Sequence, residues 1–195
     1  IESDGDVELK TTEEVASFAA TKTTVVKGNL IIGSDAEEAE KITDISALAS
    51  LKEVTGNIVI RNSYNGADLT GLDNIVSAGG LQVGSTDVAS KATELHMISM
   101  KALETLSGDI SVYNDQVTYV LFEKLATIGG SVMFNASSLQ SFEFPVLTTV
   151  GQDLNLQGLN EENTAAGSIA SLEIPELTSV GGVLSVNNLA KLTSM

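Results

Sequence analysis

Few side chains in this chain could perform covalent or metal-assisted chemistry. Among 195 residues there is one histidine, His96, one arginine, Arg61, and no cysteine. A Cys/His dyad or a histidine-rich metal site therefore cannot form. A Ser-His-Asp triad is arithmetically possible, but the chain has no G-x-S-x-G turn to hold the serine. We predict no catalytic residue and no cofactor, with His96 near the junction of a loop and a strand.

Carboxylates are the remaining reactive groups. Hydrolysis by carboxylates alone needs two acids that face each other across a substrate. Glu143 and Glu173 occupy equivalent positions in two similar segments, so we interpret them as neighbours on one solvated face. A second acidic run offers oxygen ligands suited to Ca²⁺ but lacks the D-x-D-x-D-G spacing of a calcium loop. We interpret this run as a solvated loop and only a weak calcium candidate: Asp35, Glu37, Glu38 and Glu40.

The charge balance narrows the classes of partner. The net charge is −16, from 26 acidic and 10 basic residues, and the basic residues are spread thinly. A protein that covers a phosphate backbone needs clustered Lys and Arg, so nucleic acid and anionic membranes are poor partners. No run of 18 apolar residues exists that could form a transmembrane segment.

Apolar residues recur three apart in six groups along the chain. The groups are Leu48/Leu51/Val54, Leu69/Leu72/Ile75, Met100/Leu103/Leu106, Phe122/Leu125/Ile128, Phe144/Leu147/Val150 and Ile174/Leu177/Val180. Most are followed by a glycine and then by alternating apolar residues, as in Gly108-Asp109-Ile110-Ser111-Val112. Successive copies lie 22–23 residues apart, and three copies are longer. A fixed repeat of this length predicts a solenoid in which each coil stacks on its neighbours.

Within each repeat the alternation predicts a strand whose apolar side chains point inward. Phe142 and Phe144 belong to a second inward strand of the same repeat. Asparagines cluster just past the first strand, where they tolerate turn conformations and bond nearby backbone. We predict a mainly β solenoid of about seven coils over residues 25–195, ending in mid-coil, with asparagine corners at Asn62, Asn114, Asn135, Asn187 and Asn188.

The two ends of the chain differ from the repeats. Residues 1–10 are acidic and aperiodic, which predicts a flexible tether. Thr11 to Glu14 match the S/T-x-x-E capping box, and an apolar stripe follows, so residues 11–24 are predicted to hold a short helix that caps the first coil. A partner-binding helix is the alternative. Because the sequence stops in mid-coil, we expect further domains beyond the C-terminus or a partner at that end.

The outward side chains of the first strand form the candidate binding surface. Three insertions begin just past this strand, at residues 33–41, 84–91 and 158–168, so their loops are expected along one edge. Amide, aromatic and guanidinium side chains on such a face suit contact with a protein or a glycan. The alternative is an ordinary exposed sheet. The candidate ligand-binding residues are Arg61, Gln82, Tyr113, Asn155 and Gln157.

The repeat L-x-x-[VIL]-x-G-x-[LIV]-x-[VLI]-x-x-N resembles that of the receptor L-domain family of leucine-rich, right-handed parallel β-helices. The likeness covers residues 11–195 and is closest to bacterial, Bacteroidetes-type surface proteins, on the segments 11–19 and 26–32. The resemblance implies an extracellular or cell-surface location, a lipid anchor in some members, and recognition of proteins or glycans without catalysis. The chain lacks the flanking cysteines of the animal receptors, so growth-factor binding is not implied.

Two other functions remain open at this point. The chain could be a structural spacer that holds another domain of a larger surface protein away from the surface. Right-handed β-helices also include carbohydrate-active lyases, which need a cluster of calcium-binding Asp residues and a Lys or Arg base on one face. Arg61 has no such cluster in its own strand, so we favour an adhesion or binding module over an enzyme.

Overall fold

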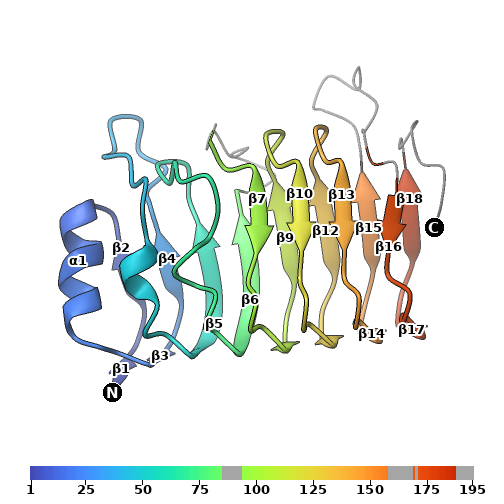
Figure 1. Ribbon diagram of the computed structural model, residues 1–195, viewed down its shortest axis with the longest axis horizontal. Helices are drawn as coiled ribbons and strands as arrows, with labels where there is room; N and C mark the ends of the chain where they lie inside the picture. The colour runs from blue at the N-terminus through green and yellow to red at the C-terminus, as the bar shows by residue number, and fades with distance from the viewer. Residues whose placement is uncertain (85–93, 158–168, 170, 188–195) are drawn as a thin grey trace.

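The fold consists of parallel strands that successive repeats contribute in turn. The computed structural model describes residues 1–84, 94–157, 169 and 171–187. A fourteen-stranded sheet and a four-stranded sheet, the small sheet, form two layers (Figure 1). The strands of the small sheet are β7 (Met97–Ser99), β10 (Tyr119–Leu121), β13 (Ser141–Glu143) and β16 (Ser171–Glu173).

The fourteen-stranded sheet contains two rows of strands, because each repeat contributes two strand segments to it. We call the first the short ladder: β1 (Glu2–Asp4), β3 (Val25–Lys27), the first parts of β5 (Glu53–Ile60) and β6 (Ser77–Val83), β8 (Thr105–Leu106), β11 (Thr127–Ile128), β14 (Thr149–Val150) and β17 (Ser179–Val180). We call the second the long ladder: β2 (Val7–Leu9), β4 (Leu30–Ile32), the last parts of β5 and β6, β9 (Ile110–Tyr113), β12 (Val132–Asn135), β15 (Leu154–Gln157) and β18 (Leu184–Asn187).

Equivalent residues of successive repeats pair with one another in both sheets. Ile110, Val132, Leu154 and Leu184 are opposite one another on four consecutive strands of the long ladder. The strand pairs of the described residues are all parallel, and in the small sheet Val120, Phe142 and Leu172 are likewise opposite one another. Because the register never slips between these strands, each side chain lies beside its counterpart in the next repeat.

The repeated leucines share one core, as the sequence predicts. Five of them are at most 1% exposed and belong to a single apolar cluster, and Leu177 packs against that cluster from a partly exposed position. The buried five are Leu51, Leu72, Leu103, Leu125 and Leu147. The prediction of a mainly β fold with stacked parallel strands and one short helix is therefore confirmed.

Four phenylalanines occupy the C-terminal part of this core. Phe134 on β12 and Phe142 on β13 meet edge to face, with ring centroids 5.1 Å apart. Phe142 also contacts Phe144, at 4.6 Å, and Phe144 stacks on Phe122 at 5.1 Å. Because Phe134 comes from the fourteen-stranded sheet and Phe142 from the small sheet, this cluster joins the two layers.

Polar side chains at the corner before the long ladder connect each repeat to the next. The carboxylate of Asp6 accepts the backbone N–H of Asn29, and Asn29 accepts that of Asn57. Asp153 accepts the N–H of Val183 at 2.7 Å. A corner role is also found on the other side of the long ladder, where Asn114 is buried and accepts the N–H of Gln116. These bonds satisfy turn amides that have no strand partner.

Glycines beside the short ladder allow the repeats to approach closely. A Cβ atom built on Gly151 would overlap the carbonyl of Gly129, and one on Gly181 would overlap the carbonyl of Gly151. These positions therefore require glycine because of the backbone of the preceding repeat.

The N-terminus differs from its prediction. We expected a flexible tether over residues 1–10, but β1 pairs with β3 and β2 pairs with β4. Two side-chain contacts hold this segment against the next repeat. Lys27 forms an ion pair with Glu2, and the side-chain amide of Asn29 donates a hydrogen bond to the carboxylate of Asp6. The prediction was wrong because it was based on the acidic side chains alone. Composition does not show that the backbone of this segment can pair with the edge strands β3 and β4.

Helix α1 (Thr12–Ala20) has the predicted capping box. Thr11 accepts the N–H of Glu14 at 3.1 Å, and the Glu14 carboxylate accepts the N–H of Thr11 at 3.1 Å. Val15 and Ala19 are buried. Figure 1 shows α1 at the end of the molecule where the chain begins, and it contacts β2 and the 3-10 turn η1 (Ser46–Leu48).

Candidate functional site

The outward side chains of the long ladder form one surface, which we call the contact face. They fall into two rows, because alternate residues of a strand point to the same side. The first row contains Glu8, Ile31, Val59, Gln82, Ser111, Met133, Asn155 and Ser185, of which Ile31 is buried. The second row, two residues further along each strand, contains Arg61, Gly84, Tyr113, Asn135, Gln157 and Asn187.

The structure places all five predicted ligand-binding residues on this face. Gln82 lies on β6, Tyr113 on β9, and both Asn155 and Gln157 on β15, while Arg61 directly follows β5. Gln157 is exposed, and the other four are half-buried. Gln82 donates from its side-chain amide to the carbonyl of Gly84 at 3.0 Å. The predicted residues are thus spread across several strands of the face.

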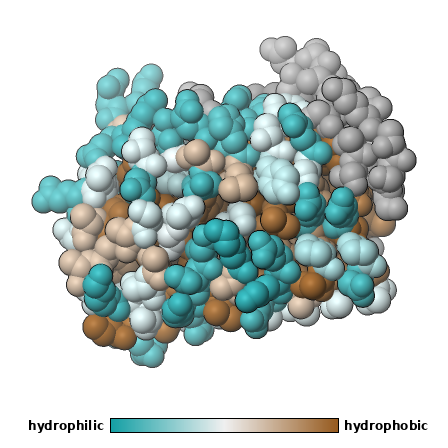
Figure 2. Space-filling model, viewed as in Figure 1, coloured by the Kyte–Doolittle hydropathy of each residue, from teal (hydrophilic) through white to brown (hydrophobic). Residues whose placement is uncertain are grey.

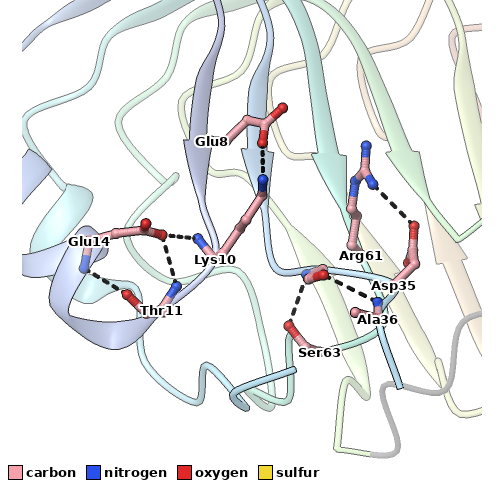
Figure 3. Close-up of polar contacts among 9 residues, drawn as sticks. Glu8, Lys10, Thr11, Glu14, Asp35, Ala36, Arg61 and Ser63 are labelled. Atoms are coloured by element: carbon pink, nitrogen blue, oxygen red, sulfur yellow. Dashed lines mark hydrogen bonds and ion pairs between the residues drawn. The ribbon is translucent and has the colours of Figure 1, made fainter. Parts of the chain in front are cut away.

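Arg61 already forms an ion pair with one acidic side chain and lies near a second. Its guanidinium forms an ion pair with Asp35 at 3.4 Å (Figure 3). The pKa of Glu8 is lowered, chiefly by its ion pair with Lys10 and to a smaller extent by the charge of Arg61. The Nε of Arg61 is buried without a hydrogen-bond partner in the described part of the chain. Charged groups therefore gather at the N-terminal end of the contact face.

The first insertion, residues 33–41, is held against its surroundings by hydrogen bonds. Ser63 accepts the N–H of Ser34 at 2.9 Å, and Asp35 accepts the N–H of Asn62 at 3.1 Å (Figure 3 draws the bond to Ser63). The Glu40 carboxylate accepts the N–H of Thr12 at 2.8 Å, at the N-terminus of α1. This bond lowers the pKa of Glu40.

These contacts bear on the weak calcium candidate. Over the described ranges, no three His, Cys, Asp or Glu side chains come together in a group that could hold a metal ion. Asp35 forms an ion pair with Arg61, whereas Glu40 accepts a hydrogen bond from the N-terminus of α1. The two carboxylates therefore have different partners. An open pocket of about 490 Å³ lies beside the loop, lined by Asp35, Ala36, Glu37, Ala39, Lys41, Asn62 and Ser63.

The other two predicted edge loops fall outside the described residues. The insertion at 84–91 is described only at Gly84, and the insertion at 158–168 is not described. The prediction that all three loops line one edge therefore stays a prediction.

The remaining candidate catalytic groups lie away from the contact face. His96 is exposed just before β7, with Nδ1 3.1 Å from the carbonyl oxygen of Gln116. Glu143 and Glu173 are neighbours on adjacent strands of the small sheet, which is not an arrangement that faces two acids across a substrate. Tyr119 donates to Glu143 at 3.0 Å, and this bond raises the pKa of Tyr119. Figure 2, seen from the same side as Figure 1, shows polar and apolar side chains intermixed on this face.

Sequence reasoning missed two members of the site. Glu8 and Lys10 lie at the N-terminal edge of the contact face, on or beside β2, and form an ion pair at 2.5 Å. The alternation Val7-Glu8-Leu9 is the signal that could have placed Glu8 on an outward row. This alternation covers only three residues of an acidic segment, which is too few to predict a strand.

Comparison with known proteins supports the resemblance over part of the chain. Residues 22–90 match the family model described as the Receptor L domain. No match was found among curated proteins or among solved structures. In the described part of the chain, no helix is long and apolar enough to cross a membrane.

Proposed function

We propose that this chain is a non-enzymatic recognition module on a bacterial cell surface, where it acts as an adhesin or as the binding domain of a larger, surface-anchored protein. In this proposal the two sheets close into a right-handed, leucine-rich β-helix. The contact face binds the ligand, and the catalytic and cofactor sites of a carbohydrate-active β-helix are absent.

One observation carries the proposal. The outward side chains of the long ladder stand in two continuous rows along consecutive strands, on a scaffold whose core runs through every described repeat. A rigid scaffold of this kind holds polar and aromatic side chains at fixed spacings, which lowers the entropy cost of binding. The match of residues 22–90 to the Receptor L domain supports recognition as the role, since that family consists of ligand-binding modules.

The proposal is tested by binding of host proteins and glycans to the purified chain. Tyr113→Ala and Arg61→Ala should weaken a positive interaction, because both side chains lie on the contact face. Tyr119→Ala is the matched control, since Tyr119 is a half-buried tyrosine on the small sheet. Absence of binding across broad panels would contradict the proposal and favour a structural spacer. Turnover of a polysaccharide in the presence of Ca²⁺ would contradict the non-enzymatic assignment.

A further inference from the structure

From β6 to β18 the contact face carries no charged side chain. The nine outward side chains over these five strands are Gln82, Ser111, Tyr113, Met133, Asn135, Asn155, Gln157, Ser185 and Asn187. We call this surface the neutral segment. The chain as a whole has 26 acidic and 10 basic residues, so a surface of nine outward positions without a charge differs from the overall composition. The charged pairs of the face lie beyond its N-terminal end, at Arg61 and Lys10.

Among the described residues, three carboxylates that flank the neutral segment are bonded to backbone. Asp109 and Asp153, at the corner before the long ladder, each accept an N–H from the next repeat at 2.7 Å. Asp115, just past β9, accepts the N–H of Ser137 at 3.1 Å and its hydroxyl at 2.8 Å. These acids therefore stabilise the stacking of the repeats, and their acceptor oxygens are directed along the stack.

The chemistry of the neutral segment is that of amides and hydroxyls. Asn and Gln side chains both donate and accept, as Ser and Tyr hydroxyls do. The hydroxyl groups of a sugar have the same double capacity, whereas a charged group offers only donors or only acceptors. The amide oxygen of Asn155 is also buried without a hydrogen-bond partner among the described residues, and such an acceptor is ordinarily satisfied.

Tyr113 supplies the apolar part of the surface. Its ring is half-buried at the end of β9, with Asn135 beside it on the next strand. On the other side the same row holds Gly84, which has no side chain to cover the ring. Met133, one strand away in the first row, adds a second apolar contact. A sugar ring has an apolar face that can pack on such an aromatic side chain.

We propose that the neutral segment binds an uncharged, polyhydroxylated glycan that lies across strands β6 to β18. This inference rests on the proposed function, because it assigns a ligand class to the same contact face. The five strands span about 19 Å at the usual separation of ~4.8 Å per strand, which accommodates a short oligosaccharide. The overall charge of −16 disfavours acidic glycans at this surface.

The test is calorimetric titration with neutral oligosaccharides built from glucose, mannose, galactose or N-acetylglucosamine, and with uronic acid oligosaccharides for comparison. A neutral oligosaccharide should bind with an affinity that low and high salt leave unchanged, because no ion pair is formed. Tyr113→Ala should weaken binding by roughly tenfold, the effect of losing one well-packed aromatic contact. Gln157→Glu should weaken it too, because the isosteric carboxylate has lost its donors.

Two variants act as controls. Tyr119→Ala removes a tyrosine from the small sheet, and Gln140→Glu adds the same charge at an exposed position just before β13. Both should leave the affinity for the glycan unchanged. All four variants should unfold cooperatively on heating, which shows that each of them is folded.

Three outcomes would overturn the inference. The first is neutral glycan binding that Tyr113→Ala and Gln157→Glu do not weaken. The second is binding of acidic glycans alone. The third is a protein partner, bound in a salt-dependent manner and lost in Tyr113→Ala, with no glycan bound. That third result would leave the proposed function standing, whereas failure of every protein and glycan to bind would overturn both.

Discussion

Replacing Phe142 with alanine tests whether the small sheet and the fourteen-stranded sheet share one core. Phe142 is 1% exposed and contacts Phe134 and Phe144. Burial of an aromatic side chain contributes about 1.5–3 kcal/mol, and each aromatic pair adds about 0.5–1.5 kcal/mol. The cavity left behind adds a further cost, so Phe142→Ala should lower the free energy of unfolding by about 4 kcal/mol.

The measurement is urea unfolding followed by circular dichroism. For an m-value of about 2 kcal/mol per molar urea, a loss of about 4 kcal/mol lowers the midpoint by about 2 M. Val146→Ala is the control, since Val146 lies in the turn after β13 and is 39% exposed. It should change the free energy of unfolding by about 0.5 kcal/mol or less.

A double-mutant cycle isolates the contact between the layers. Phe134→Leu and Phe142→Leu, alone and together, should show a coupling energy of about 0.5–1.5 kcal/mol. A midpoint shift for Phe142→Ala no larger than that of Val146→Ala would refute the shared core. Additivity of the two leucine variants would refute direct contact between the rings.

Three further predictions concern the N-terminal cap and the spacing of the repeats. Thr11→Ala removes the hydroxyl that caps Glu14 in α1 and should cost about 1 kcal/mol in urea unfolding; an unchanged midpoint would contradict the capping box. The pKa of Glu40 is lowered from its ordinary 4.5 because a first-turn amide of α1 donates to it. Ionised Glu40 therefore stabilises the folded state above pH 4.5, and this contribution is lost as the pH falls through the lowered pKa. Glu40→Gln should flatten the acid side of a curve of stability against pH. An unaltered slope would contradict this prediction. Gly151→Ala should cost roughly 1–3 kcal/mol in thermal unfolding, since the new methyl group overlaps the carbonyl of Gly129; wild-type stability would show that the repeats stack less closely.

The repeats could be predicted because burial imposes its own period on a sequence. Leu103, Leu125 and Leu147 recur at equal spacing and are all buried in the same cluster. The capping box at Thr11 could be predicted for a similar reason, since its hydrogen bonds join residues three apart. Local patterns of this kind depend on short stretches of chain, which the sequence displays directly.

The N-terminal strands could not be predicted from composition. Residues 1–10 are short and acidic, and their order comes from a strand edge that lies more than 20 residues later in the chain. The ion pair of Lys27 with Glu2 belongs to the same contact. Only pairing with β3 and β4 gives this segment the hydrogen bonds that a free tether would lack.

The candidate site was also predicted only in part from the sequence. Alternation along each strand determined by itself that Gln82, Tyr113 and Asn155 would share an outward face, because side chains on a strand have a period of two. The tertiary structure decided that Arg61 is bound to Asp35 and that Glu40 serves the helix N-terminus. These contacts depend on how the loop of residues 33–41 packs against the strands and against α1. The spacing of residues along the chain does not predict which side chains this packing brings together.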